Sequence, residues 1–241
     1  MTNATTLAFV RAFDNEHKAD KLVFLLGRAC VDDFFEILVL AGSGYGFGAL
    51  KILRSLYEKA VASRFIASKP ELAQDFVDYG SVTQWKLMRS LEAVLGDKAI
   101  DPKDREDVTK RYEAIKQRFE NEKCDKCGLA RYRTWADEDL VTMASQFEIL
   151  KSLLPTAYYM PMSHTHATAA TLAQRLDIND DGIKFSTTAG RDQSDNALTV
   201  GHAVLMDVLD LQASLFKVAG LPEALKQCEE DFEAIWNPEE K

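Results

Sequence analysis

The sequence predicts an all-α protein, a single-domain helical bundle of about eight helices spanning residues 1–241. Three observations predict this class. Apolar residues recur at three- and four-residue spacing along most of the chain. No alternation typical of a strand extends over a useful length, and capping residues, prolines and glycines mark the ends of the helices. Hydrophobic residues make up 46% of the chain, enough for a sizeable core without disulfides.

The first half of the chain contains four helices by this periodicity. The run Gly42–Gly48, in which every second residue is glycine, predicts a tight turn between two of them. Pro70 ends the helix before it, because the residue preceding a proline is biased away from helical geometry. The predicted helices cover residues 5–15, 19–40, 49–68 and 71–96.

The second half contains shorter helices separated by loops. Asp101 and Pro102 predict a helix start, and the helix extends over residues 101–123. Thr134 and Ser163 are predicted to cap two further helices. The remaining predicted elements are a loop at 124–133, helices at 134–154 and 163–175, a polar loop at about 176–195, and helices at 196–219 and 222–236.

Charge and hydropathy exclude some classes of function. With 29 Lys and Arg against 38 Asp and Glu, the net charge is −9, which disfavours nucleic-acid binding without excluding a local basic cleft. The most apolar stretch, residues 22–41, carries four charged residues, so we expect no membrane association. No secretory signal is evident, and we expect a cytoplasmic protein with its four cysteines reduced.

Cys124 and Cys127, followed by Gly128, form a C-x-x-C hook. This spacing lets two thiolates bind one Zn²⁺ ion, and His164 with His166 are the candidates for the other two ligands. Two alternatives stay open, a redox dithiol and a pair of loop thiols without a ligand.

Arg54 and Glu58 lie at i,i+4 spacing and so share one face of a predicted helix. They form either an exposed ion pair of little energetic value or a buried pair that holds an anion or orients a histidine. Downstream, Ser163, His164 and His166 open another predicted helix. A helix N-terminus favours anions and lowers the pKa of a histidine, although capping serine and core histidines are the alternative.

These motifs, in this order, resemble a family of bacterial all-helical proteins of unknown function. The resemblance covers about residues 20–236. It implies a helical bundle and a shared cluster of candidate catalytic residues, Arg54, Glu58 and His166, but no activity. The accompanying candidates for ligand binding are Tyr57, Tyr79, Ser163 and Thr168. The motifs that carry the resemblance are Arg54-x-x-Tyr57-Glu58, Pro70-Glu71 with Phe76 and Tyr79, Cys124-x-x-Cys127-Gly128, Trp135, Met143-Ala144, Tyr158-Tyr159-x-Pro161 and His166-Ala167-Thr168.

More distantly, such bundles are similar to HEPN domains, many of which are metal-independent ribonucleases with an arginine and a histidine four to six residues apart. Here that spacing occurs only between Arg11 and His17, near the N-terminus. The first functional hypothesis is therefore a non-catalytic module that binds a ligand or partner, with a structural zinc. The second is a HEPN-like ribonuclease or other phosphate hydrolase in stress or phage defence. Under either hypothesis we expect a homo-oligomer, most simply a homodimer.

Overall fold

The computed structural model describes residues 1–11, 17–96, 98–123, 130–165, 169–179, 182–185 and 191–236. The chain divides into two compact units, one made of Met1–Ser68 with Leu140–Lys241 and the other of Lys69–Asp139. Both units are built mainly from helices, so the predicted all-α class is confirmed. No helix in the described ranges is long and apolar enough to cross a membrane.

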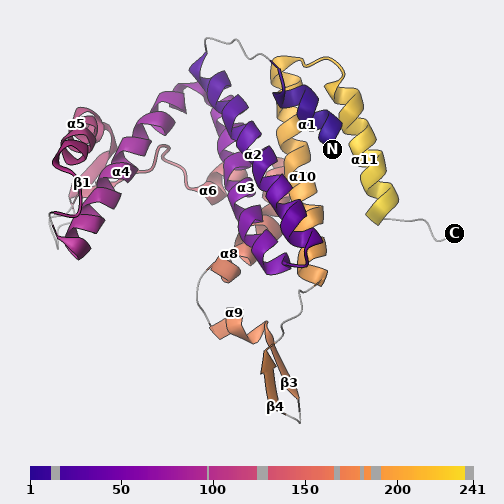
Figure 1. Ribbon diagram of the computed structural model, residues 1–241. Helices are drawn as coiled ribbons and strands as arrows, with labels where there is room; N and C mark the ends of the chain where they lie inside the picture. The colour runs from indigo at the N-terminus through magenta and orange to yellow at the C-terminus, as the bar shows by residue number, and fades with distance from the viewer. Residues whose placement is uncertain are drawn as a thin grey trace. The chain divides into compact units, whose positions relative to one another are not determined.

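Three long helices form the centre of the larger unit: α2 (Lys18–Gly42), α3 (Gly46–Ser68) and α10 (Arg191–Phe216). They pack on one another more extensively than any other elements, and Figure 1 shows them side by side. The apolar stripe of α3, with Leu50, Leu53 and Leu56, is completely buried between its neighbours. The turn from α2 to α3 passes through Gly44 at a φ of 83°, as the glycine run predicts.

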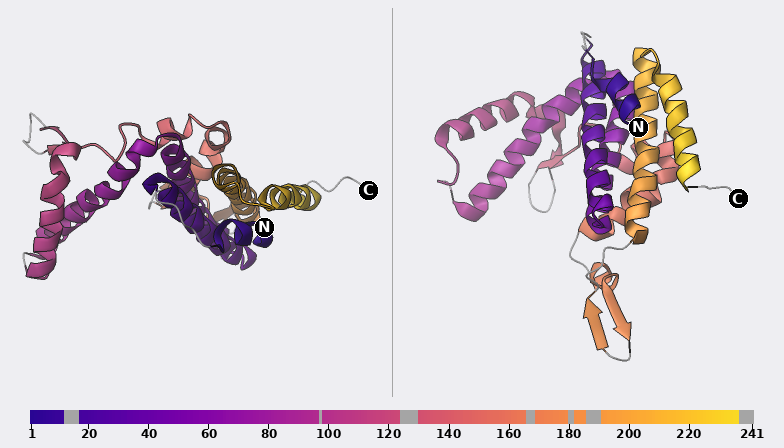
Figure 2. Two further views of the ribbon diagram at one scale, coloured as in Figure 1. Left: turned by 90° about the horizontal axis from the view of Figure 1, so that it is seen from above. Right: turned by 45° about the vertical axis from the view of Figure 1, so that its right-hand side comes forward.

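Two terminal helices complete this side of the larger unit, α1 (Thr2–Phe9) and α11 (Leu221–Trp236). Both contact α10, and Figure 2 shows α11 running alongside it. The chain reverses between α10 and α11 at Gly220, whose φ of 74° favours glycine.

A series of short helices crosses the other side of α3. The predicted helix over 134–154 is wrong in its extent, because the first helical residue after the smaller unit is Leu140. Thr134 caps no helix; its hydroxyl donates to the carbonyl of Ala136. Pro155 and Pro161 each lie in the first turn of a new segment, where the missing N–H costs little, so helical structure continues between the helices predicted at 134–154 and 163–175. The segments are α6 (Leu140–Ala144), α7 (Glu148–Leu153), the π-helix η2 (Leu154–Tyr159), α8 (Met160–Thr165) and α9 (Ala169–Ala173).

The smaller unit is a helical hairpin of α4 (Ala73–Leu95) and α5 (Pro102–Phe119), preceded by the short 3₁₀-helix η1 (Pro70–Leu72). Asp101 caps α5 as predicted, accepting a hydrogen bond from the Lys103 N–H at 2.8 Å. The core of the smaller unit is small and aromatic, and the rings of Trp85 and Tyr112 stack in it with centroids 4.2 Å apart.

Two β-hairpins were not predicted. β1 (Glu120–Lys123) pairs with β2 (Ala130–Tyr132), and β3 (Leu176–Asn179) pairs with β4 (Gly182–Phe185). The second hairpin and the start of α10 occupy much of the segment predicted as a polar loop. Each strand has four residues or fewer, too short for alternation to stand out against a helical background.

Candidate functional site

One face of α3 carries a line of polar and aromatic side chains. Phe47, Lys51, Arg54 and Glu58 follow one another at spacings of four, three and four residues, which aligns them along the helix. The π-helix η2 and α8 contact α3, and both contribute side chains to this line. We call these residues, together with the three described next, the α3 cluster: Phe47, Lys51, Arg54, Glu58, Tyr158, His164 and Arg175.

Arg54 and Glu58 form the predicted ion pair, with Nε of Arg54 2.8 Å from Oε1 of Glu58. The pair is neither fully exposed nor buried, because the Arg54 side chain is 22% exposed and that of Glu58 43%. The Arg54 guanidinium lies 4.7 Å from the centre of the Tyr158 ring on η2, within the range of a cation–π contact. Within the described part of the chain the terminal nitrogens of Arg54 have no hydrogen-bond partner, so they are available to an incoming group.

Tyr57 lies beneath this line and has a different role in the packing. Its side chain is completely buried, and its hydroxyl donates to the carbonyl of Leu150 on α7 at 2.6 Å. Burial raises the pKa of Tyr57, with smaller contributions from the charges of Asp207 and Tyr159. Tyr57 therefore ties α7 to α3 and keeps the ring of Tyr158, 6.3 Å away, in place beside Arg54.

His164 lies at the other end of the α3 cluster and is 6% exposed. Its ring packs against Phe47 of α3, with ring centroids 4.9 Å apart. Burial lowers the pKa of His164, and the positive charges of Arg175 and Lys51 lower it further, so the imidazole is neutral at pH 7. Its Nδ1 is buried and has no hydrogen-bond partner among the described residues.

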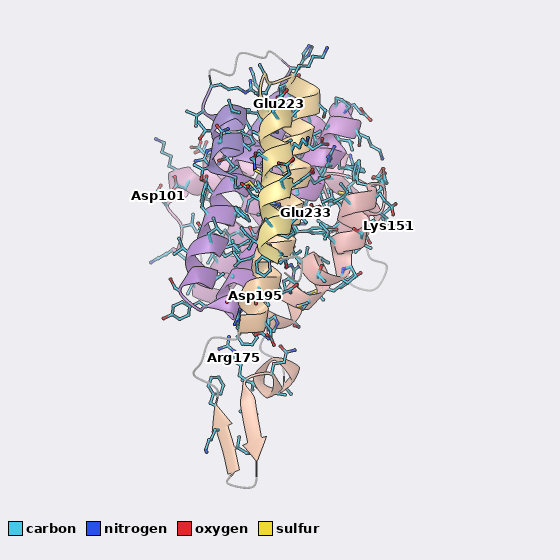
Figure 3. The ribbon with its side chains drawn as sticks, turned by 90° about the vertical axis from the view of Figure 1, so that its right-hand side faces the viewer. Asp101, Lys151, Arg175, Asp195, Glu223 and Glu233 are labelled. Carbon is cyan, nitrogen blue, oxygen red and sulfur yellow. The ribbon has the colours of Figure 1, made fainter. Side chains whose placement is uncertain are left out.

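Arg175 joins the α3 cluster from the segment between α9 and β3. Its guanidinium lies 4.6 Å from the centre of the Phe47 ring, on which His164 also packs. In the view of Figure 3 Arg175 is labelled below Asp195, and Asp195 belongs to the first turns of α10. The Arg175 Nε is buried and, like the His164 Nδ1, has no hydrogen-bond partner among the described residues. Two side chains that contact the Phe47 ring thus each carry a nitrogen atom without a hydrogen-bond partner among the described residues.

The other residues predicted for the site do not belong to the α3 cluster. The prediction that Ser163 caps a helix is wrong, because α8 already begins at Met160; the Ser163 hydroxyl donates to the carbonyl of Met160 instead. Tyr79 belongs to the smaller unit, where its ring packs on Phe119 at 5.6 Å. Four candidates lie outside the described residues: Cys124, Cys127, His166 and Thr168.

Sequence reasoning missed Phe47, Lys51, Tyr158 and Arg175 as members of the α3 cluster. The signal for Lys51 was available, because it lies three residues before Arg54 on the same helical face. Nothing in the sequence indicated that Arg175 reaches Phe47, since that contact depends on the tertiary fold. The described residues contain no group of three or more histidine, cysteine or acidic side chains arranged to hold a metal ion.

A groove of about 820 Å³ lies elsewhere in the larger unit, between α10 and α11. Apolar side chains including Met206, Leu225 and Phe232 line it, with Glu229 and Glu233 among its acidic residues. Figure 3 looks onto α11 and labels Glu233. None of the residues that line this groove belongs to the α3 cluster, and the groove is not lined by several lysine or arginine side chains.

Comparison with known families identifies the chain. The model of a family of unknown function, DUF5677, matches residues 20–183, which is more than half of the sequence. The chain belongs to the DUF5677 family. The predicted membership of a family without a known function is confirmed, over a shorter range than the predicted 20–236. No curated protein and no solved structure gave a significant match.

The DUF5677 match contains every residue of the α3 cluster as well as Cys124, Cys127, His166 and Thr168. It excludes α10 and α11, which follow residue 183. The α3 cluster thus lies in the part of the chain that has the DUF5677 pattern, whereas the groove between α10 and α11 is formed almost wholly by residues beyond it.

Proposed function

We propose that the protein is a ligand-binding helical module whose α3 cluster binds a small anion that carries a phosphate group. The observation that carries this proposal is the pair of buried nitrogen atoms, Nδ1 of His164 and Nε of Arg175, that have no partner among the described residues. A buried polar atom without a hydrogen bond costs roughly 1–3 kcal/mol, and a bound ligand removes that cost.

The local charge supports an anion over a cation. Within the α3 cluster, Lys51, Arg54 and Arg175 contribute three positive charges against the single carboxylate of Glu58, a net charge of +2 for the cluster residues. The whole chain carries −9, so the α3 cluster has the opposite sign from the protein as a whole. A small cationic region in an acidic protein attracts a small anion, while the surrounding negative charge repels a long nucleic-acid backbone.

Each cation suits a separate part of the ligand. The terminal nitrogens of Arg54 match a pair of phosphate oxygens, because Nε is already held by Glu58 and the plane is fixed over Tyr158. Lys51 supplies a flexible point charge beside them. Neutral His164 accepts or donates one hydrogen bond without adding charge.

Calorimetric titration with inorganic phosphate and with nucleoside monophosphates tests this function. We expect Arg54→Ala and Lys51→Ala each to weaken binding about 10- to 100-fold, the equivalent of roughly 1.5–3 kcal/mol for a charged hydrogen bond. Arg28→Ala is the matched control, because Arg28 pairs with Asp32 at the same i,i+4 spacing and at 2.5 Å on α2. Equal affinities for wild type, Arg54→Ala and Arg28→Ala contradict the proposal.

Hydrolysis of a phosphate ester is the second candidate function. The observation that favours it is the lowered pKa of His164 beside the charges of Arg175 and Lys51, which keeps an imidazole neutral and able to act as a general base. His166, a candidate predicted from the sequence, is the alternative for that role, with Arg54 stabilising phosphate charge and Glu58 orienting one of them. Turnover of a phosphodiester or a short RNA that is lost in His164→Gln or His166→Gln, with folding intact, supports hydrolysis. Activity unaffected by both variants and by Arg54→Ala ends it.

A structural zinc ion at Cys124 and Cys127 is a separate part of the proposal. The antiparallel pairing of Lys123 with Ala130 supports it, because it holds together the two residues that flank the stretch containing Cys124 and Cys127. Native mass spectrometry measures bound metal directly. We expect the mass of one Zn²⁺ in wild type and its loss in Cys124→Ser, and His164→Ala then tells whether that histidine is a further ligand. A wild-type mass equal to that of the bare chain removes zinc from the proposal.

We also propose the cytoplasm as its compartment. Cys30 and Cys228 are buried and unpaired, so neither needs an oxidising environment. Burial raises the pKa of the Cys30 thiol, and the nearby charge of Asp33 raises it further, so this thiol stays protonated and unreactive. Labelling of free thiols in protein isolated under non-reducing conditions tests this proposal. We expect the cysteines to be reduced, and oxidised cysteines would place the protein outside the cytoplasm.

A further inference from the structure

Helices α3 and α10 run in the same direction and begin at the same end of the larger unit. At that end, a Cβ atom on Gly46, the first residue of α3, would lie 2.5 Å from the backbone nitrogen of Ser194 in the first turn of α10. Further along both helices, Arg64 pairs with Asp207 at 2.8 Å. These two contacts follow in the same order along each helix, so the two N-termini lie side by side.

Two adjoining helix N-termini favour an anion. Each N-terminus carries the equivalent of about half a positive charge, and the effects of two aligned dipoles add. The acidic residues in the first turns of α10 do not cancel this charge. Asp195 lies 3.6 Å from Arg191, and Asp192, two residues before Ser194, does not share its face of the helix.

The hydroxyl of Ser194 points to a ligand at this place. Ser194 is 7% exposed, and its Oγ atom is buried without a hydrogen-bond partner among the residues that the structure describes. Side chains of an α-helix tilt toward its N-terminus, so the Ser194 hydroxyl is directed toward the start of α10. A buried hydroxyl costs free energy until its hydrogen bond is filled, and a phosphate oxygen accepts such a bond.

The α3 cluster extends to the same end of the two helices. His164 packs on Phe47 in the first turn of α3, and the Arg175 guanidinium lies 4.6 Å from the centre of the same ring. From α10, Nδ2 of Asn196 lies 3.1 Å from Sδ of Met160, the first residue of α8. Three side chains at this end each carry a buried polar atom without a hydrogen-bond partner in the described ranges. We call them the helix-end subsite: Ser194 with Oγ, His164 with Nδ1 and Arg175 with Nε.

Arg54 lies too far along α3 to share one phosphate group with the helix-end subsite. Phe47 and Arg54 are seven residues apart, about 10 Å at the rise of an α-helix. The Arg54 guanidinium is held further away still, because its Nε lies 2.8 Å from Glu58, one turn beyond. Hydrogen bonds to a phosphate oxygen are about 2.9 Å long, so a single phosphate group does not bridge this distance.

We infer that the ligand of the α3 cluster carries two phosphate groups separated by a sugar, one bound by Arg54 and the other by the helix-end subsite. This ligand class rests on the proposed function and extends it from one phosphate group to two. The charges match, because the α3 cluster carries +2 and the two helix N-termini add about +1. Two phosphate monoesters bring roughly three to four negative charges at pH 7. A diphosphate, whose two phosphorus atoms share an oxygen, is too short to reach both places.

Two isomeric probes separate the spacing of the phosphate groups from their number. Adenosine 3′,5′-bisphosphate and adenosine 5′-diphosphate contain the same atoms, but only the first carries its phosphate groups on different sides of the sugar. In calorimetric titration of the full chain we expect the bisphosphate to bind about 10- to 100-fold more tightly than adenosine 5′-monophosphate, through the added charged hydrogen bonds. The diphosphate should gain much less.

Ser194→Ala tests the helix-end subsite itself. It should reduce the preference for the bisphosphate over the monophosphate about tenfold, because one hydrogen bond to a charged group is lost. The thermal unfolding temperature of the ligand-free variant should not fall, since the hydroxyl has no protein hydrogen bond to lose among the described residues. Ser63→Ala is the matched control, because Ser63 is also a buried serine but lies near the other end of α3, where it should leave the preference unchanged.

Two results overturn the inference: equal affinities for the bisphosphate and the diphosphate, or a preference that Ser194→Ala leaves unchanged. If adenosine 5′-monophosphate still binds and Arg54→Ala weakens it, the proposed function stands without the second phosphate group. If none of the three nucleotides binds, both fail.

Discussion

Arg64 on α3 holds Asp207 on α10 in a two-point ion pair. The Arg64 Nε lies 2.9 Å from Oδ2 of Asp207 and its Nη2 lies 2.8 Å from Oδ1. The Asp207 side chain is buried, and the same Nη2 also donates to the Asp207 carbonyl. Burial works against the charge on Arg64, but the hydrogen bonds and charges of Asp207 and Asp210 outweigh it and raise the pKa of Arg64.

Removing one partner of this pair should destabilise the larger unit strongly. We expect Asp207→Ala to lower the free energy of unfolding by about 3–5 kcal/mol, because Arg64 is left partly buried without its counter-charge. Urea denaturation at pH 7 measures the change. Glu230→Ala, which removes the exposed pair between Lys226 and Glu230 on α11, should cost less than about 1 kcal/mol. Similar costs for the two variants would show that Arg64 and Asp207 contribute little to joining α3 and α10.

Two glycines in the first turn of α3 should respond oppositely to alanine. A Cβ at Gly46 would lie 2.5 Å from the backbone nitrogen of Ser194, whereas a Cβ at Gly48 meets nothing closer than 3.7 Å. We therefore expect Gly46→Ala to lower the free energy of unfolding by roughly 1–3 kcal/mol. Gly48→Ala should be neutral or stabilise by up to about 1 kcal/mol through helix propensity. Thermal denaturation of both variants checks this, and a neutral Gly46→Ala contradicts close contact between α3 and α10.

His202 should make stability depend on pH. Its ring stacks on Phe232 of α11 at 4.2 Å, and burial lowers the pKa of His202 to about 4, helped by the charge of the N-terminus. The unfolded chain has the ordinary histidine pKa near 6.5, so between these values it binds more protons than the folded chain, and stability falls as the pH falls.

The variant His202→Phe keeps the aromatic stack and removes the proton. Between pH 7 and pH 4.5 we expect wild type to lose about 2 kcal/mol more than this variant, less than the full pKa difference implies because the imidazole is partly exposed. Urea midpoints at the two pH values give the comparison. Equal losses in wild type and His202→Phe would show that other groups carry the acid sensitivity.

Tyr57→Phe isolates the contribution of one buried hydrogen bond. The change leaves the Leu150 carbonyl without its partner and should cost about 1–2 kcal/mol in the free energy of unfolding. Tyr45→Phe is the control, because Tyr45 is exposed and should tolerate the loss of its hydroxyl within about 0.5 kcal/mol. If the two changes cost the same in chemical denaturation, the hydroxyl of Tyr57 does not hold α7 to α3.

The sequence by itself determined the all-α class, the long helices α2 and α3, the cap at Asp101 and the shared face of Arg54 and Glu58. These features depend on residues within one or two helical turns of each other, which periodicity and capping rules describe.

Only the tertiary structure decided that Arg175 and His164 meet on Phe47, and that Arg64 finds Asp207 at a separation of 143 residues. It also decided that both prolines of the 155–161 segment continue helical structure and that short hairpins form at β1–β2 and β3–β4. Such contacts depend on how whole helices pack together, and that packing leaves no local pattern in the residues that make them.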